Sequence, residues 1–460
     1  MSDHTPEILT GVSVGAPAHG GHCVARVDGR VVFVRHTAPG EVVDVRLTDA
    51  GDGRRFWRGE AVTVHEASPD RVPSVWPEAG PGGVGGGELA HLSLPAQRRW
   101  KAEVLRDALT RIGRFAPDAF GDLTVAALGA DDETGGLGTR SRIDLVLDTH
   151  GRAGMFRHRS HDVVALEEMP LAVPAIGDLD LFADGRWAGL PPGTRIDVVA
   201  PADGAPLVIA AGQLLLPDGS PPRPVTEHRP AGPRPGRRGA RRDTRGRGGR
   251  RDQRRPAPVP DAGLTVREMV TGPFGELRYE VGAQGFWQVH RDAPATLVGA
   301  VLDAVGPVDG GRVVDMYSGA GLFTLPLAVA VGTGGQVDAI EVDPGAVRHA
   351  RRNLRDVPQA EVHVAPVTPA VVGELGADGR AVDVVVLDPP RSGAGEAVAA
   401  AVAALRPARI VYVACDPAAL ARDLRALGSH GYRATSLQGY DLFPHTHHVE
   451  CVAVLERTAG

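Results

Sequence analysis

Two side chains near the C-terminal end of this chain have types and positions that suit covalent catalysis. Cys415 follows the apolar run 410–413 and precedes Asp416 and a proline, a pair typical of a helix start. A thiol at a helix N-terminus has a lowered pKa, which favours the nucleophilic thiolate. Glu450, just before the last apolar run, offers a carboxylate that could accept a proton. The pair predicts a cysteine nucleophile with a general base; the alternative for Cys415 is a buried structural cysteine.

A glycine-rich loop further upstream predicts a ligand with a ribose. Segment 315–323 includes Tyr317, Gly319 and Gly321, and two glycines one residue apart allow a tight turn against a ligand. Glu341 ends the next apolar run, about twenty residues on, where an acid can accept hydrogen bonds from ribose hydroxyls. No Gly-Lys-Ser/Thr occurs, which excludes a triphosphate loop. The missing third glycine favours S-adenosylmethionine (SAM), which has no phosphate, over the alternative, a dinucleotide.

The motif Asp388-Pro389-Pro390-Arg391 ends another apolar run. Methyltransferases that act on exocyclic amino groups usually have an aromatic residue directly after such an Asp-Pro-Pro. Arg391 stands there, which disfavours an exocyclic nitrogen as the target. The alternative is that the two prolines only end a strand.

The composition favours a cytoplasmic protein. The chain has 460 residues, 43% of them hydrophobic, with no apolar run long enough to cross a bilayer and no secretory signal. Three cysteines exclude a disulfide scaffold and are too few for a four-cysteine zinc or iron–sulfur site. Cys23 and Cys451 are expected to be small core residues. Three histidines between Phe443 and Glu450 lack a second ligand cluster, so no metal site is expected.

The net charge of −6 hides one basic segment. Residues 223–255 contain thirteen arginines against three acidic residues, a net +10. Segment 220–258 consists largely of Arg, Pro and Gly, and it has too few apolar groups to offset the entropy of ordering. It is expected to be disordered, either as a solvated linker or as an electrostatic tether for RNA.

Three regions follow from the pattern of elements. Residues 1–68 predict a five-stranded OB-fold barrel, with an Asp-Gly hairpin turn after Val27. Residues 69–280 predict a β-rich subdomain that includes the basic segment and a helix over 95–113. Residues 281–460 alternate short apolar runs with helical patterns, which predicts a doubly wound, Rossmann-like α/β domain with its ligand at the carboxyl ends of the strands.

Together these motifs resemble the SAM-dependent RNA 5-methyluridine methyltransferase family. The resemblance lies in the order of five segments: Gly285-Phe286-Trp287-Gln288-Val289, 315–323, 388–393, 412–423 and 443–450. The N-terminal barrel is similar to the TRAM module that often precedes this enzyme. The resemblance covers nearly the whole chain except 220–258.

The resemblance implies that Cys415 is the nucleophile and Glu450 the base of a SAM-dependent RNA uracil-C5 methyltransferase. It also implies a set of residues that contact SAM or the target base: Gln288, Tyr317, Glu341 and Asp388, with Gly319 and Gly321 in the loop. Attack of a thiolate on C6 activates C5 for methylation, after which a carboxylate removes the C5 proton. The target uridine must be unpaired or flipped into the site.

Several positions depart from the family pattern. Many members have four cysteines for an iron–sulfur cluster, and the matching positions here are about Trp76, Val84, Gly87 and Met169, so no cluster is expected. Other departures flank the motifs: Ala414, Asp416 and His290 stand where Ser, Asn and Asn are frequent. These three departures bear on the rigidity of the loops and on which RNA is recognised more than on the methyl-transfer reaction.

Family association favours 23S ribosomal RNA over transfer RNA as the substrate of a monomeric enzyme. Two other functions stay open at this point: an RNA-binding protein that has lost catalysis, and an RNA cytosine-C5 methyltransferase with the same thiol addition.

Overall fold

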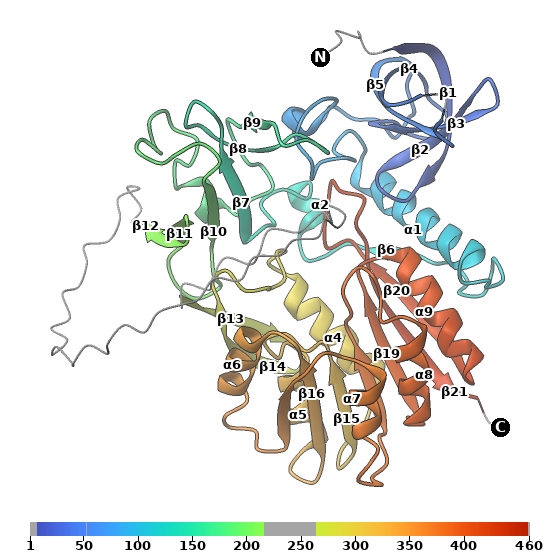
Figure 1. Cartoon of the computed structure of the whole chain (residues 1–460), viewed down its shortest axis with the longest axis vertical. Coiled ribbons are helices and arrows are strands. Elements are labelled where there is room, and N and C mark those ends of the chain that lie inside the picture. The colour runs from blue at the N-terminus through green and yellow to red at the C-terminus, as the bar shows by residue number, and fades with distance from the viewer. Residues whose placement is uncertain (1–6, 52, 216–263, 459–460) are drawn as a thin grey trace, which may run out of the picture.

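The computed structural model describes residues 7–51, 53–215 and 264–458, which form three connected parts (Figure 1). In the view of Figure 1, an N-terminal barrel and a central sheet lie above a large sheet flanked by helices. The expected disordered segment 220–258 lies outside the described residues. Within the described ranges, no helix has both the length and the apolar character needed to cross a membrane.

Five strands close the N-terminal barrel in the order β1-β2-β3-β5-β4. Their bounds are β1 Ile8–Ala18, β2 His22–Val27, β3 Arg30–Arg35, β4 Val42–Asp49 and β5 Trp57–Glu66. The hairpin turn between β2 and β3 places Asp28 and Gly29 at φ values of 49° and 80°, as a two-residue turn of this kind requires. Cys23 is buried among the valines that fill the interior. The predicted barrel is therefore confirmed.

A six-stranded antiparallel sheet forms the central part, in the order β12-β11-β10-β7-β8-β9. Its bounds are β7 Arg142–Leu147, β8 Ala153–Phe156, β9 Val163–Ala165, β10 Arg195–Val199, β11 Leu207–Ala210 and β12 Gln213–Leu215. Short helical turns lie beside it: η1 Pro77–Ala79, α2 Asp131–Thr134 and α3 Pro174–Gly177. One hydrophobic cluster joins this sheet to the segment around Trp76.

The large sheet has eight strands in the order β17-β16-β15-β18-β19-β21-β20-β6. The bounds are β6 Val125–Ala126, β15 Arg312–Met316, β16 Gln336–Glu341, β17 Ala360–Val364, β18 Val384–Leu387, β19 Arg409–Ala414, β20 Tyr432–Tyr440 and β21 Glu450–Arg457. Strands β15 to β19 are parallel within this order, and β21 is antiparallel to both of its neighbours. This order reverses direction at β15, which confirms the predicted doubly wound α/β fold.

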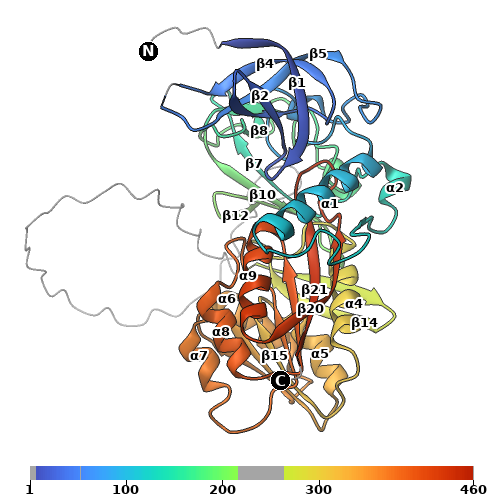
Figure 2. The same ribbon diagram turned by 90° about the vertical axis from the view of Figure 1, so that its right-hand side faces the viewer.

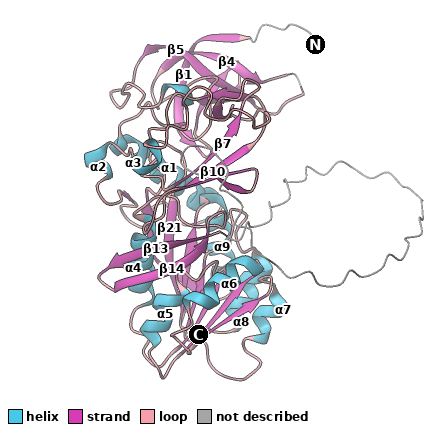
Figure 3. Ribbon diagram, turned by 90° about the vertical axis from the view of Figure 1, so that its left-hand side faces the viewer, coloured by secondary structure: helices cyan, strands magenta, loops and turns pink. Residues whose placement is uncertain are grey.

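Helices cover both faces of the large sheet (Figure 3). Their bounds are α4 Ala293–Val305, α5 Thr324–Val331, α6 Pro344–Asn353, α7 Pro369–Glu374, α8 Glu396–Ala404 and α9 Pro417–Ser429. Alternate residues of each strand point to opposite faces, so neighbours such as Val313 and Val314 belong to two different hydrophobic clusters. Helices α4, α5 and α6 complete one cluster, and α7, α8 and α9 complete the other.

Helix α1 (Leu94–Arg111) lies between the barrel and the large sheet (Figure 2). It forms at the predicted place and ends two residues earlier than the expected range 95–113. Leu105 and Leu109 on its buried face belong to the same hydrophobic cluster as α9 and β21. This helix therefore connects the barrel side of the molecule to the face of the large sheet.

A β-hairpin precedes the large sheet and packs against its helices. Strands β13 (Thr265–Gly272) and β14 (Gly275–Gly282) pair along their whole length, and Val270 and Tyr279 are buried in the same cluster as α4 and α6. The expected domain boundary at 280/281 separates this hairpin from the helices it contacts. We therefore propose that the C-terminal domain begins with β13. An alternating pattern of apolar and polar residues predicts a strand but not the domain to which the strand belongs, so the sequence could not fix this boundary.

Candidate active site

The carboxyl ends of the parallel strands bring the predicted site residues to one edge of the large sheet. The loop with Tyr317 and Gly319 follows β15, and Glu341 is the last residue of β16. Asp388 follows β18, and Cys415 follows β19. In open α/β sheets the ligand binds at this edge, where the strand order reverses.

Cys415 and Glu450 lie opposite each other at this edge. The last pair at this end of the antiparallel strands β19 and β21 joins Ala414 to Cys451. The next position of the same register places Cys415, directly after β19, across from Glu450, the first residue of β21. Opposite side chains in such a pair have their β carbons about 5 Å apart. The register therefore puts the thiol and the carboxyl group side by side.

The Cys415 thiol is protonated at neutral pH in the free protein. Burial raises the pKa of this thiol to about 12, and the carboxyl groups of Glu450 and Asp388 act in the same direction. The Arg391 guanidinium opposes the rise. Asp416 begins α9 by accepting a hydrogen bond from the backbone N–H of Ala419 at 2.8 Å. The expectation of a lowered thiol pKa is therefore wrong, because burial and two acids outweigh the helix terminus.

Three carboxyl groups beneath the edge suppress one another's ionisation. Burial raises the pKa of Asp315 to about 7, and the charge of Glu341 adds to this rise. A hydrogen bond from the Thr324 hydroxyl acts in the opposite direction. Burial and then the charge of Asp315 raise the pKa of Asp388 to about 7. Burial and then Asp388 hold the pKa of Glu450 well above its usual range. A positively charged ligand at this edge would favour their ionised forms.

The glycine loop after β15 is shaped by residues in left-handed backbone conformations. Tyr317, Gly319 and Gly321 have φ values of 66°, 55° and 90°. Glu341 holds this loop, because its Oε2 accepts the N–H of Gly319 at 3.0 Å and its Oε1 accepts that of Asp343 at 2.7 Å. Each carboxylate oxygen keeps a further lone pair for a ligand hydroxyl.

Gln288 is buried in a segment that the central part of the chain holds in place. The carbonyl of Val289 accepts both the N–H and the hydroxyl of Ser141, at 2.8 and 3.1 Å. His290 Nδ1 accepts the N–H of Asp292 at 3.1 Å, so its Nε2 carries the proton and donates to Asp131 at 3.1 Å. His290, Asp131 and Asp292 lie close enough to hold a metal ion, but both imidazole nitrogens are already hydrogen-bonded.

Sequence reasoning missed the residues of α1 that position the loop before Glu450. Lys101 forms a buried ion pair with Asp441 and also donates to the carbonyl of Phe443 at 3.0 Å. Gln97 Oε1 accepts the N–H of His445 at 2.7 Å. Lys101 is the single lysine of the chain and falls on a largely apolar helix face, a signal that could have identified it.

Asp423 on α9 positions the Asp388 loop in a similar way. Its carboxylate accepts the N–H of Ala394 at 2.7 Å and the hydroxyl of Tyr412 at 2.5 Å. Arg391 in the same loop donates to His448 at 3.3 Å. The loop after β18 is therefore connected both to α9 and to the segment that leads to Glu450.

Comparisons with known proteins agree with this arrangement. A family model described as tRNA (Uracil-5-)-methyltransferase matches residues 266–458, and a TRAM domain model matches residues 10–62. A protein of Streptomyces avermitilis named uncharacterized RNA methyltransferase is 38% identical over 459 residues, 97% of this chain and 98% of that protein. The 23S rRNA (uracil(1939)-C(5))-methyltransferase RlmD of Methylococcus capsulatus is 34% identical over 449 residues, 96% and 95% of the two chains. This chain belongs to the RNA uracil-C5 methyltransferase family.

The fold is also similar to that of a solved enzyme. The tRNA (uracil-54, C5)-methyltransferase of Pyrococcus abyssi, in complex with S-adenosyl-L-homocysteine, superposes with a TM-score of 0.61 and 20% identity, over 96% of this chain and 99% of that chain. The family, the TRAM assignment of the barrel, the RNA substrate class and, through the family, the SAM cofactor predicted from the sequence are confirmed.

The residues at the sheet edge fit SAM. Asp315 Oδ1 and Ser318 Oγ are buried and have no hydrogen-bond partner among the described residues. A β carbon at Gly319 would meet open space, so the loop leaves room beside it. Val342, directly after Glu341, is 60% exposed and offers an apolar contact for an adenine ring. Unpaired polar atoms, space and an exposed apolar side chain match a cationic nucleoside.

The positions that match the family's iron–sulfur cysteines are filled by apolar packing. Trp76, Val84 and Met169 belong to one buried hydrophobic cluster. A β carbon at Gly87 would approach Ala79 Cβ to 2.6 Å and the Trp76 ring to 3.0 Å. These residues offer no thiolate and no space, so they do not fit a cluster.

Proposed function

We propose that this enzyme methylates C5 of a uridine in 23S ribosomal RNA, with Cys415 as the nucleophile and Glu450 as the general base. The observation that supports this most directly is the antiparallel register that sets Cys415 across from Glu450, beside the loop after β18. One group that can add to a pyrimidine ring and one that can remove a proton from it therefore share the same edge.

The proposed reaction starts with the addition of the Cys415 sulfur to C6 of uracil. The S–C6 bond forms as the C5–C6 double bond opens, and C5 becomes an enolate carbon that can accept a methyl group. The thiol must lose its proton in this step, since its pKa of about 12 keeps it protonated at rest. Asp388, with a pKa of about 7, is partly ionised at neutral pH and is the acceptor on this chain.

Glu450 completes the proposed reaction after methylation. Bound SAM supplies the methyl group as an electrophile. Glu450 then removes the C5 proton, the electrons of that C–H bond restore the C5–C6 double bond, and the S–C6 bond breaks. Arg391 favours the ionised form of Glu450 that this step needs. A paired uridine cannot reach this edge, so the base must be unpaired or flipped.

We propose that four residues bind SAM or the target base. Glu341 would accept the ribose hydroxyls, and Asp388 would face the cationic part of the donor, because burial and Asp315 make its own charge costly without one. Tyr317 has a left-handed backbone conformation in the loop beside Gly319, and Gln288 is buried two residues after Phe286, which is 79% exposed.

Similarity supports ribosomal RNA as the substrate. The relative of Methylococcus capsulatus, named as a 23S rRNA enzyme, is 34% identical over nearly the whole chain, whereas the Pyrococcus abyssi enzyme named for tRNA is 20% identical. We further propose that the enzyme acts as a monomer in the cytoplasm, where ribosomal RNA is found.

Mapping of 5-methyluridine tests the proposed function. Ribosomal and transfer RNA from cells with and without the gene are digested and their modified nucleosides are quantified by mass spectrometry. The expected result is loss of one 5-methyluridine from 23S rRNA, restored by the wild-type gene and not by a Cys415→Ala gene. Loss from tRNA would overturn the substrate, loss of 5-methylcytidine would identify a cytosine enzyme, and no change would favour an RNA-binding protein without catalysis.

A further inference from the structure

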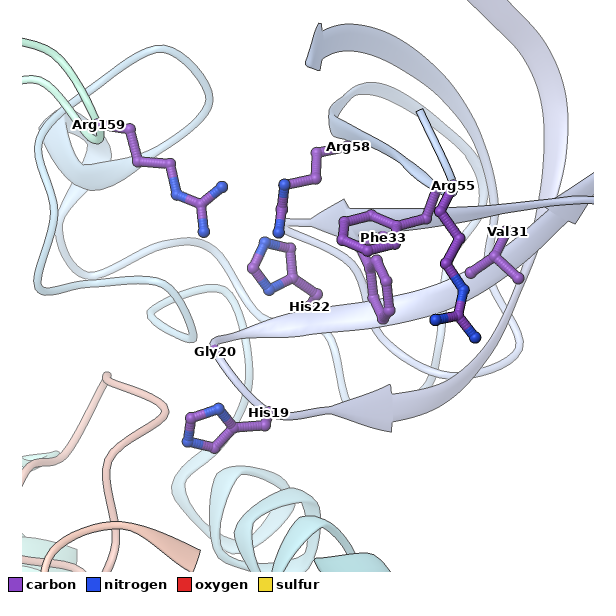
Figure 4. Close-up of a pocket in the computed structure, with 9 residues that line it drawn as sticks. His19, Gly20, His22, Val31, Phe33, Arg55, Arg58 and Arg159 are labelled. Atoms are coloured by element: carbon purple, nitrogen blue, oxygen red, sulfur yellow. The ribbon is translucent and has the colours of Figure 1, made fainter. Parts of the chain in front are cut away.

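A pocket of about 630 Å³ opens on the barrel, on the side of the barrel that faces the β8–β9 loop of the central part (Figure 4). Its lining includes two phenylalanines and three arginines: Phe33, Phe56, Arg55, Arg58 and Arg159. In Figure 4, Arg159 approaches from the opposite side to the barrel residues. The pocket therefore lies between two parts of the chain.

The arginines of this pocket have more positive charge than the protein neutralises. Arg58 pairs with Asp49 at 3.0 Å. Arg55 and Arg159 are exposed, and neither side chain forms an ion pair or a hydrogen bond with any residue that the structure describes. Burial and the nearby charge of Arg58 lower the pKa of Arg159, and the more weakly acting charge of Asp49 opposes them. Like charges held together in an acidic chain create a site for an anion.

The aromatic side chains of the pocket offer a surface for a planar ring. The rings of Phe33 and Phe56 are edge to face, with centroids 5.3 Å apart, and both side chains are partly exposed. The Arg58 guanidinium lies 4.7 Å from the centre of the Phe56 ring. His22 contacts Phe33 from the buried side. Aromatic rings next to arginines are the combination with which barrels of this type bind the bases and phosphates of single strands.

His19 connects the pocket to the proposed active site. This residue lines the pocket, and its Nε2 lies 3.1 Å from Asp416 Oδ2, one residue after Cys415. Its ring is also 6.1 Å from that of His447, in the segment that leads to Glu450. A ligand in the pocket therefore contacts His19, which in turn contacts Asp416 beside the nucleophile and His447 in the segment before the base.

We propose that this pocket binds an unpaired nucleotide of the substrate RNA that flanks the target uridine. Its base packs against Phe33 and Phe56, and the phosphates on its two sides approach Arg159 at one end of the pocket and Arg55 at the other (Figure 4). The inference rests on the proposed function for the identity of the RNA. The inference goes beyond that function because the barrel would supply a binding subsite near the active site, and would not only hold the RNA at a distance from it. A base in a duplex has no free face, so the subsite selects single-stranded RNA.

Binding of a short RNA to the full chain tests the subsite. Fluorescence anisotropy, without SAM, follows a fluorescein-labelled single-stranded RNA of the target sequence over a range of salt concentrations. We expect the double variant Arg55→Gln/Arg159→Gln to bind about 10-fold more weakly and to reduce the slope of log K against log salt by about 1. Phe33→Leu should weaken binding about 5-fold with the slope unchanged, because a ring contact involves no counterion.

Two control variants test whether the loss of any exposed arginine or phenylalanine weakens RNA binding, or only the loss of those in the pocket. Arg433→Gln changes an exposed arginine on β20, and Phe156→Leu changes an exposed phenylalanine that does not line the pocket. Both controls should bind RNA within 2-fold of the wild type. Wild-type affinity in the pocket variants would overturn the proposal. So would equal affinity for the matching duplex, or displacement of the RNA by millimolar inorganic phosphate, which would indicate a simple anion site.

Methylation assays distinguish this inference from the proposed function. If the enzyme methylates uridine and the pocket variants have the wild-type KM for RNA, the subsite is wrong and the function stands. If the protein binds RNA through the pocket but transfers no methyl group, the function is wrong and the subsite stands. If both are right, the KM for RNA of the double variant rises by the same factor as its Kd.

Discussion

The ammonium group of Lys101 and the carboxylate of Asp441 form an ion pair closed off from solvent, with side chains 0% and 1% exposed. Lys101 lies on α1, outside the large sheet, and Asp441 opens the segment that leads from β20 to Glu450. The same ammonium donates to the carbonyl of Phe443 at 3.0 Å. The position of the proposed base is therefore fixed from outside its own domain.

Replacement of this lysine should destabilise the protein strongly. Lys101→Met keeps the length of the side chain but leaves the carboxylate of Asp441 buried without a partner. We expect the free energy of unfolding to fall by about 3 kcal/mol, measured by urea denaturation. The double variant Lys101→Met/Asp441→Leu removes both charges and should recover most of that loss. A single variant as stable as the wild type would show that the pair does not hold the segment.

Replacement of the proposed nucleophile should abolish methyl transfer without abolishing cofactor binding. Cys415→Ala removes only the sulfur, at a position after β19 and outside the glycine loop after β15. We expect turnover below detection and a Kd for SAM within 3-fold of the wild type, measured by calorimetry. The control Cys23→Ala, in the barrel core, should retain turnover. Measurable turnover by Cys415→Ala would reject the covalent mechanism.

Replacement of the proposed base should trap the enzyme on its RNA. Glu450→Gln keeps the size of the side chain but cannot accept the C5 proton, so the methylated adduct cannot release the Cys415 sulfur. We expect a band of protein bound to RNA that survives denaturing electrophoresis. The double variant Cys415→Ala/Glu450→Gln should give no such band. Free product at the wild-type rate would mean that another group removes the proton.

The buried carboxyl group of Asp315 should make the free protein less stable as pH rises. Its pKa is about 7 in the folded state against an ordinary value of 3.8, so the folded state holds a proton that the unfolded state has lost between these values. Stability therefore falls with rising pH through this window and levels above it. The Asp315→Asn variant has no carboxyl group to titrate at this position, so it does not lose this stability as pH rises. The difference in the free energy of unfolding between variant and wild type should therefore shift in favour of the variant by about 2 kcal/mol between pH 5 and pH 8.

Thermal unfolding at several pH values measures this effect. The matched control Asp356→Asn changes an 87% exposed side chain and should follow the wild type at every pH. If Asp315→Asn also keeps a constant offset from the wild type between pH 5 and pH 8, the raised pKa of Asp315 is wrong.

The sequence predicted those parts of the site that depend on strand periodicity. Parallel strands end at a common edge whatever their side chains, so the apolar runs before Glu341, Asp388 and Cys415 were enough to bring these residues together. The register of β19 against β21 was not available from the pattern, since strand pairing is a long-range contact. Only the structure places Glu450 across from Cys415.

Electrostatic properties could not be predicted in the same way. The helix start after Cys415 is a local signal, and it suggested a lowered thiol pKa. The pKa rises instead, because burial and two carboxyl groups from distant parts of the chain act on the same atom. The contacts of α1 with the segment before Glu450 were missed for a related reason: a buried lysine looks like a surface lysine until its partner is known.

The activity should rise with pH near neutrality, and Arg391 should influence that rise through Glu450, the base that must also be ionised. Loss of the thiol proton to Asp388 requires the ionised carboxylate, whose pKa in the free protein is about 7, so kcat/KM for SAM should increase through that pH. Arg391 lowers the pKa of both Cys415 and Glu450, since its positive charge favours their ionised forms. Arg391→Gln removes that charge, which favours the protonated forms and should move the rise to higher pH by about half a unit. The exposed Arg433→Gln on β20 should leave the profile unchanged. A shift of the Arg391→Gln profile to lower pH would contradict the charges assigned to this edge.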